Sequence, residues 1–339
     1  MAILVTGGAG YIGSHTVVAL VEAGYEVAIV DNLCNSEEKV VDTLSKLTGK
    51  HLPFYKVDIR DKEGLMGVFQ AQTSLGQPIT GVIHFAALKS VGDSVEKPDL
   101  YEDNNVGGTL TLLDAMSESK VESIVFSSSC TVYGQPEVIP VDESAPILPA
   151  ESPYGYTKQK CEELISAHTE NSPGFAASLL RYFNPIGAHP SSLIGESPKG
   201  VPNNLVPFLC QAVAGLRAEL VVFGDDYPTN DGSCVRDYLH VCDLAEAHVA
   251  ALKAIKPGTC EAYNLGTGQG SSVLELISEF EKSTGEKVPY RIGGRRDGDI
   301  VSIFADPSKA EKVLGWNASR TMGEALRDAW NWTKVSLGQ

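Results

Sequence analysis

A glycine-rich turn near the start of the chain restricts the fold more than any other feature. Residues 2–5 form an apolar run typical of a strand, residues 11–23 have helical periodicity, and three glycines with the spacing G-x-x-G-x-x-G separate them. Such a turn lets backbone N–H groups approach a pyrophosphate, and the following helix N-terminus adds partial positive charge. The order strand, turn, helix therefore predicts a dinucleotide site formed by Gly7, Gly10, Tyr11, Ile12 and Gly13.

A carboxylate follows the second expected strand, which spans residues 25–30. Asp31 comes 18 residues after Gly13. A carboxylate at this place accepts hydrogen bonds from the adenosine ribose and repels a 2′-phosphate, so the sequence predicts NAD rather than NADP. Further polar contacts around the adenosine are expected from Asn32, Asn35 and Ser36.

Strand and helix alternate through the first half of the chain. Further strands are expected at 56–57, 81–87 and 123–128, and helices at 61–72 and 99–119. This alternation predicts a parallel sheet covered by helices on both faces. The pair Asp58 and Ile59 follows the third strand, where both side chains could contact adenine; alternatively, Asp58 could cap the next helix.

The second half of the chain differs in composition and in the length of its expected strands. Prolines and glycines cluster at 184–190 and 197–202, and the expected strands, at 220–223 and 262–265, are short. We predict an α/β protein: a Rossmann doubly wound parallel sheet with a smaller mixed α/β C-terminal lobe for the substrate. The predicted NAD-binding domain spans 1–184, with later returns near 235–260, and the predicted second lobe is built largely from 185–339.

Composition excludes several classes of protein. The 339 residues carry a formal net charge of −16, which argues against nucleic-acid or anionic-membrane binding. No apolar run is long enough to cross a membrane. The seven cysteines include no C-x-x-C pair, so we expect reduced thiols, no metal site and a cytoplasmic location.

A tyrosine and a lysine one helical turn apart form the candidate catalytic pair. Ser152 and Pro153 are typical of a helix start, which places Tyr154 and Lys158 on one face. A nearby ammonium and a positive nicotinamide ring would lower the pKa of the phenol and so make it a base. Ser129 follows another strand, and a hydroxyl at the carboxyl end of a parallel strand lies in the ligand crevice.

The motifs together resemble the extended short-chain dehydrogenase/reductase family and, within it, the UDP-glucose 4-epimerases. The resemblance covers nearly the whole chain. Its most specific motifs are SSSCTVYG at 127–134, SPYGYTK at 152–158, RYFNPIGAHP at 181–190, VPNNLVP at 201–207, VRDYLHV at 235–241 and RRDGD at 295–299.

The resemblance implies a redox-neutral isomerase of galactose metabolism that interconverts UDP-galactose and UDP-glucose with tightly bound NAD. In that family, the residue matching Tyr154 takes the proton of the sugar 4-hydroxyl, helped by Lys158 and Ser129. Carbon 4 gives its hydride to the nicotinamide, and the 4-keto sugar turns over before the hydride returns.

The resemblance also implies binding residues. Positions that line the cofactor are Phe85, Ala86, Lys89, Asn104, Ser129, Tyr154, Lys158, Tyr182 and Phe183. Positions that hold the UDP-sugar are Lys89, Ser129, Tyr154, Asn184, Asn204, Leu205, Val221, Phe223, Arg236, Arg296, Asp299 and Ile303. A homodimer through the helices around 100–119 and 152–170 is implied as well.

Two departures from the family pattern and three rival functions stay open. Cys130 replaces an expected alanine, and Ile303 has an intermediate size where the family's sugar breadth is set, so acceptance of N-acetylhexosamines is undecided. A dehydratase would carry Asp-Glu after Thr131, where this chain has Val132-Tyr133. The second rival is another NAD-dependent epimerase, such as one acting on UDP-glucuronate, and the third is a non-catalytic NAD sensor.

Overall fold

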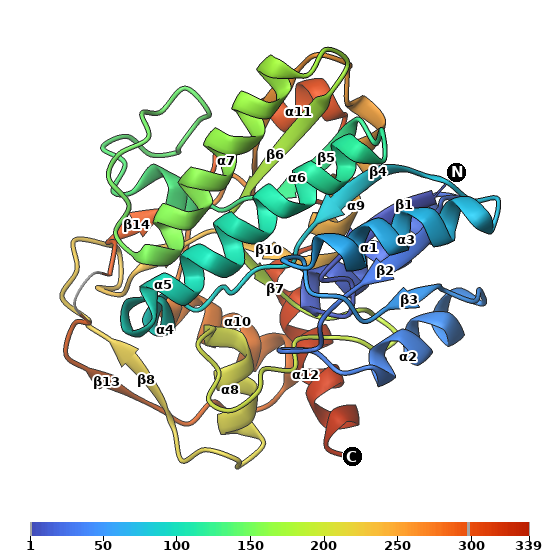
Figure 1. The fold of residues 1–339 in the computed structure, drawn as a ribbon. Helices are drawn as coiled ribbons and strands as arrows, with labels where there is room; N and C mark the ends of the chain where they lie inside the picture. Colours follow the sequence, from blue (N-terminus) through green and yellow to red (C-terminus); the bar gives the residue numbers. More distant parts are fainter. Residues whose placement is uncertain (1, 297–298, 339) are drawn as a thin grey trace.

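Seven parallel strands form a central sheet between two layers of helices (Figure 1). The computed structural model describes residues 2–296 and 299–338. The strand order is β11-β6-β5-β4-β1-β2-β3, the doubly wound arrangement predicted from the sequence. The strands are β1 (Ala2–Thr6), β2 (Glu26–Val30), β3 (Phe54–Tyr55), β4 (Ile79–His84), β5 (Ser123–Ser127), β6 (Ala176–Tyr182) and β11 (Cys260–Leu265).

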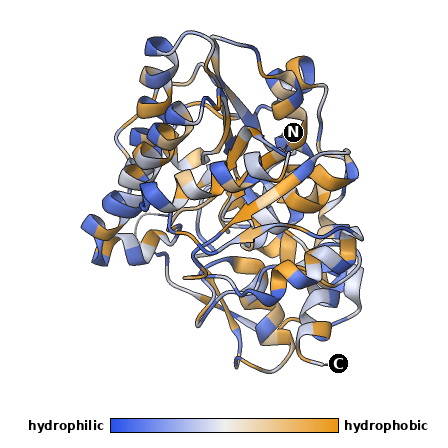
Figure 2. Cartoon of the chain, turned by 45° about the vertical axis from the view of Figure 1, so that its right-hand side comes forward, coloured by the Kyte–Doolittle hydropathy of each residue, from blue (hydrophilic) through white to orange (hydrophobic). Residues whose placement is uncertain are grey.

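Helices cover both faces of this sheet because its strands are apolar on both sides. Along β1, Ile3 and Val5 contribute to the core on one face, and Leu4 to the core on the other. Hydrophobic colour follows the strands in the middle of the molecule (Figure 2). One face is covered by α1 (Tyr11–Glu22), α2 (Lys39–Thr48), α9 (Val241–Ala254) and α11 (Ser308–Leu314), the other by α3 (Lys62–Ser74), α6 (Gly108–Glu118) and α7 (Pro153–Asn171).

Later parts of the chain form a second hydrophobic core of their own. In it, the Phe280 and Trp330 rings meet edge to face with their centroids 6.1 Å apart. The helices here are α8 (Leu205–Val213), α10 (Val273–Thr284) and α12 (Met322–Ser336). Short strands accompany them: β7 (Asn184–Ile186), β8 (Leu220–Phe223), β9 (Val235–Arg236), β10 (Tyr238–His240), β12 (Ser271–Ser272), β13 (Tyr290–Gly293) and β14 (Ser302–Ile303).

Three sequence predictions need correction. The third strand lies at Phe54–Tyr55, just before the predicted 56–57. The helix predicted at 99–119 is divided into α5 (Pro98–Tyr101), a π-helical turn and α6, with the short α4 (Val91–Glu96) ahead of them. The strand predicted at 262–265 pairs with β6 and so extends the large sheet instead of the second lobe. The division of the chain into two domains stays a prediction.

Candidate active site

The predicted dinucleotide turn lies at the carboxyl end of β1, where the strand order reverses between β1 and β4. Gly7 has φ +69°, and a Cβ there would stand 2.8 Å from the backbone nitrogen of Ala86. A Cβ on Gly13 would stand 2.2 Å from the Gly7 carbonyl oxygen. The turn therefore packs so tightly that only glycine fits at these two positions.

The start of α1 has no side-chain cap, because its N-cap residue is Gly10. The free N–H groups of the first turn, which include those of Tyr11 and Ile12, suit an anion such as a pyrophosphate. The Tyr11 hydroxyl donates to the carbonyl oxygen of Gly187 at 2.7 Å, so this side chain ties the turn to the segment after β7.

Asp31 lies directly after β2 and is buried, as an adenosine ligand must be. Its Oδ2 accepts from the backbone N–H of Ala9 at 3.1 Å, and its Oδ1 accepts from Leu33 and from the Ser36 hydroxyl at 2.9 and 2.7 Å. A carboxylate offers about four acceptor positions, so one remains for a ribose hydroxyl. The turn, the uncapped helix and this carboxylate together fit NAD.

The other residues predicted to contact the adenosine differ in their hydrogen-bond partners and in their burial. Asn32 donates to Asp58 at 3.0 Å, and Arg60 also bonds this carboxylate and thereby holds its pKa well below the ordinary value. The cap of α3 is Asp61, which removes the helix-cap interpretation of Asp58. Ile59 is buried, and Asn35 is exposed.

The π-helical turn at Glu102–Gly107 carries Asn104 and Asn105 into the interior beside the cofactor crevice. The amide of Asn105 accepts from the Leu88 N–H at 2.8 Å and donates to Thr157 on α7 at 3.1 Å. Asn104 donates to the Asn105 amide oxygen at 2.9 Å. Extra turns of this kind re-aim side chains at functional sites, and here the turn couples the loop after β4 to α7.

The candidate catalytic residues come from two neighbouring elements. Ser152 accepts from the Gly155 N–H at 3.1 Å and caps α7, as predicted. Lys158 is buried and donates to the carbonyl oxygen of Ser127 at 2.7 Å, and its Nζ lies 5.9 Å from the centre of the Tyr154 ring. The structure therefore brings α7 against the end of β5, where Ser129 follows.

Burial dominates the electrostatics of the Tyr154–Lys158 pair. Burial raises the pKa of the Tyr154 phenol above its ordinary value, although its hydrogen bond with Ser129 acts in the opposite direction. Burial also lowers the pKa of Lys158 to about 8. The predicted lowering of the tyrosine pKa includes the effect of the positive nicotinamide ring and stays a prediction for the complete site, because desolvation acts against the charged phenolate in the protein alone.

Aromatic residues and Cys130 complete the walls of the crevice. The Phe85 and Tyr182 rings pack against His248, with centroid distances of 4.6 and 6.2 Å. Phe183 is buried in a small core with Ile303. Burial raises the pKa of the Cys130 thiol to about 12, despite the nearby Arg236 guanidinium, so the thiol is neutral at ordinary pH.

The predicted UDP residues of the second lobe largely come together. The Arg296 guanidinium donates to Asp299 at 2.7 Å and lies 5.2 Å from the centre of the Phe223 ring. Arg236 lies 3.9 Å from the same carboxylate and donates to the Ile300 carbonyl oxygen at 2.7 Å. Ile303 pairs with Arg236 across β14 and β9, and Val221 precedes Phe223 by two residues on β8. Asp297 and Gly298 lie outside the described residues.

Glu196 joins two predicted ligand residues, although no sequence pattern pointed to it. Its Oε1 accepts from Lys89 at 3.1 Å and from the Asn204 amide at 2.6 Å. Its carbonyl oxygen accepts from the Trp332 indole at 3.1 Å. Leu205 begins α8 directly after Asn204. No local pattern marks Glu196, because its partners are distant in the sequence.

Residues 196–204, which we call the strap, cross from the second lobe to the adenosine loop. Lys199 donates to the carbonyl oxygens of Leu33 and Cys34 at 3.2 and 3.0 Å. Asn203 donates to the Ser90 hydroxyl at 3.0 Å. The strap therefore ties the second lobe to the loop that follows Asp31 and to Ser90.

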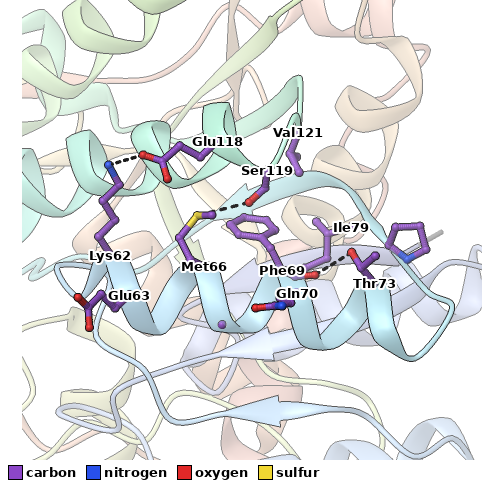
Figure 3. A pocket seen from close by; sticks show the side chains of 12 residues that line it. Lys62, Glu63, Met66, Phe69, Gln70, Thr73, Ile79, Glu118, Ser119 and Val121 are labelled. Carbon is purple, nitrogen blue, oxygen red and sulfur yellow. Dashed lines mark hydrogen bonds and ion pairs between the residues drawn. The ribbon is translucent and has the colours of Figure 1, made fainter.

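A surface pocket between α3 and α6 is separate from this crevice (Figure 3). Lys62 and Glu118 form an ion pair of 2.7 Å across it, and the Ser119 hydroxyl donates to the Met66 sulfur at 3.5 Å. None of the side chains lining it is a predicted site residue. Within residues 2–296 and 299–338, no helix is both long and apolar enough to cross a membrane.

Comparison with known proteins places this site in a family. A family described as GDP-mannose 4,6 dehydratase matches residues 4–329. UDP-glucose 4-epimerases from Bacillus subtilis and Dictyostelium discoideum are 52% and 48% identical, over 99% and 98% of this chain and 98% and 96% of their own length.

Solved structures agree with the curated relatives. The UDP-glucose-4-epimerase of Stenotrophomonas maltophila, with bound NAD and formylated UDP-arabinopyranose, has a TM-score of 0.95 and 48% identity and covers 100% of this chain and 99% of its own. That of Bifidobacterium longum, with NAD+ and UDP, has a TM-score of 0.93 and 45% identity, covering 99% and 98%. The chain therefore belongs to the UDP-glucose 4-epimerase family of extended short-chain dehydrogenases/reductases.

Proposed function

We propose that the chain catalyses the reversible interconversion of UDP-galactose and UDP-glucose by inverting carbon 4 through a 4-keto sugar. The observation that carries this proposal is the buried Tyr154–Lys158 pair against residues 127–133, which we call the serine turn. The pair lies between the glycine turn that fits NAD and the arginine residues of the second lobe, Arg236 and Arg296. The identity of about 50% to curated UDP-glucose 4-epimerases supports the same reaction.

The cofactor would lie along the carboxyl ends of the sheet. The glycine turn and the α1 N-terminus would hold its pyrophosphate, Asp31 its adenosine ribose, and Lys158 its nicotinamide ribose. When bound there, the cofactor would supply the hydride acceptor, and later the hydride donor, for sugar carbon 4. The crevice walls, which include Phe85 and Tyr182, exclude water from the reacting carbon.

Tyr154 is proposed to take the proton of the sugar 4-hydroxyl and to return it to the same oxygen after the 4-keto sugar has turned over. Its phenol pKa is raised by burial in the protein alone, so the positive charges that gather at the complete site must favour the phenolate. Lys158 is the chain's own contribution to that charge, and its Nζ is fixed by Ser127. Ser129 would hydrogen-bond the same sugar hydroxyl.

The second lobe is proposed to hold UDP while the sugar turns. Arg236 and Arg296 would neutralise the diphosphate, because guanidinium groups form paired hydrogen bonds to phosphate oxygens. Asp299 already bonds Arg296 and would accept from the uridine ribose. Phe223, which is 42% exposed, would hold the uracil together with Val221.

Tyr154→Phe tests the proposal. We expect conversion of UDP-galactose to fall at least 100-fold, the usual contribution of a general base, with the bound NAD unchanged. The matched control is Tyr156→Phe, two residues along the same helix and 43% exposed, which should keep full activity. A wild-type protein that binds NAD but converts no UDP-sugar would instead favour the NAD sensor.

A homodimer and a cytoplasmic location belong to the same proposal. Leu110 on α6 and Tyr156 on α7 are 49% and 43% exposed, which suits a helix-to-helix contact between two copies. The seven cysteines are free thiols, as expected in a reducing compartment.

A further inference from the structure

A buried ionic network lies directly behind the serine turn. Glu162 and Arg181 are 8% and 7% exposed, and their side chains meet through bonds of 2.9 and 2.5 Å. The Ser128 hydroxyl donates to the same carboxylate at 2.5 Å. Ser128 immediately precedes Ser129, so the network reaches the backbone of a proposed catalytic residue.

The network also holds the other end of the serine turn. Arg181 donates from Nη1 to the Tyr133 hydroxyl at 3.0 Å, and this hydroxyl donates to the Asn264 amide oxygen at 2.7 Å. Tyr133 and Asn264 are fully buried. The arginine therefore connects both flanks of the turn that carries Ser129 with β6 and β11.

Three side chains from neighbouring positions of α7 form hydrogen bonds with this same turn. Lys158 bonds the Ser127 carbonyl oxygen, Gln159 donates to the Val132 carbonyl oxygen at 2.8 Å, and Glu162 accepts from Ser128. Because α7 also carries Tyr154, these bonds set the position of the serine turn relative to the phenol.

Stability alone does not account for such a pair. Removing two charges from water costs free energy that their attraction only partly returns, and well-packed apolar residues are often at least as stable. We infer that Glu162 and Arg181 are positioning residues, which fix Ser129 against Tyr154 through Ser128. This inference rests on the proposed epimerase function.

Ser128→Ala is the test, because it removes the network's bond next to Ser129 and leaves the ion pair and its bond to Tyr133 intact. A misplacement of about 1 Å can cost about 100-fold in rate; with Lys158 and Gln159 still in place, we expect kcat for UDP-galactose to fall about 10-fold. The KM and the NAD bound per chain should stay within about twofold of the wild-type values, since a positioning defect acts on kcat.

A kinetic isotope effect separates positioning from a purely structural role. With UDP-galactose that carries deuterium at carbon 4, the isotope effect on kcat should increase in Ser128→Ala, because hydride transfer becomes more rate-limiting. Glu162→Gln, which keeps an acceptor for Ser128 but loses the charge, should show the same direction in the molecules that retain NAD.

Thr169→Val is the matched control. It removes a buried hydroxyl, which donates to the Ile165 carbonyl oxygen of the same helix, and it should leave kcat and the isotope effect unchanged. The inference is overturned if Ser128→Ala has wild-type kcat per bound NAD, or if its loss of rate matches a loss of bound NAD without a change in isotope effect. Failure of the epimerase function itself would appear separately, as an inactive wild-type protein.

Discussion

The glycine turn gives a prediction whose magnitude follows from the structure. In Gly13→Ala, the new Cβ would stand 2.2 Å from the Gly7 carbonyl oxygen, where ordinary contact begins at 3.4 Å. Backbone on both sides must therefore separate by about 1.2 Å (3.4 − 2.2). Overpacking of this kind costs about 1–3 kcal/mol, and a factor of ten corresponds to about 1.4 kcal/mol.

If the turn relaxes away from the pyrophosphate, NAD affinity falls by about 5- to 140-fold. The assay is calorimetric titration of NAD into protein stripped of cofactor, together with the NAD content of the protein as purified. Gly10→Ala should be milder, because its Cβ would stand 3.1 Å from the same oxygen.

Gly67→Ala is the matched control, since a Cβ at this position in α3 meets nothing within 4 Å. It should bind NAD normally and unfold at a slightly higher temperature, because alanine favours a helix by about 1 kcal/mol over glycine. Wild-type NAD affinity in Gly13→Ala would refute the reasoning from the turn's packing.

Three further predictions concern single side chains. Lys158→Met should abolish epimerisation yet stabilise the NAD-free protein by at most about 3 kcal/mol at pH 7. The reason is that burial lowers the pKa of Lys158 to about 8. The free-energy cost of the buried charge is therefore full below pH 8 and disappears as the pH rises towards 10.5. Urea unfolding of the variant and the wild type at pH 7 and 10 measures this cost, and an equal difference in stability at the two pH values would contradict the prediction. Lys199→Ala should speed NAD release without lowering kcat at saturating NAD, because it removes the strap's bonds to Leu33 and Cys34. Cofactor exchange measures the release rate, and an unchanged rate would exclude a role for the strap in retaining NAD. Ile303→Ala should raise kcat/KM for UDP-N-acetylgalactosamine relative to that for UDP-galactose. Because Ile303 is only 4% exposed, the substitution should also cost about 2–5 kcal/mol of stability. An unchanged ratio of the two kcat/KM values would show that another residue limits the sugar pocket.

Local signals predicted the parts of the fold that local sequence determines. The alternation of apolar strands and periodic helices indicated the parallel sheet, and Ser152 with Pro153 indicated the start of α7. The four-residue spacing of Tyr154 and Lys158 placed both on one helix face.

The features that the sequence did not predict depend on contacts between residues that are far apart in the chain. The strand at Cys260–Leu265 belongs to the large sheet because it pairs with β6, which no local pattern reveals. The interactions of Glu196, and the ion pair between Glu162 and Arg181, form only with residues that folding brings beside them. The pKa of Tyr154 is raised by burial, a property of the whole fold that no local sequence pattern indicates.

The central claim is that the chain inverts carbon 4 with a cofactor that never leaves. The most direct measurement incubates the purified protein with UDP-galactose and no added nicotinamide, assays UDP-glucose, and then denatures the protein to count released NAD. The account predicts conversion with close to one NAD per chain. NAD on the protein without any conversion of UDP-galactose would contradict it and direct attention to UDP-glucuronate or to keto-sugar products.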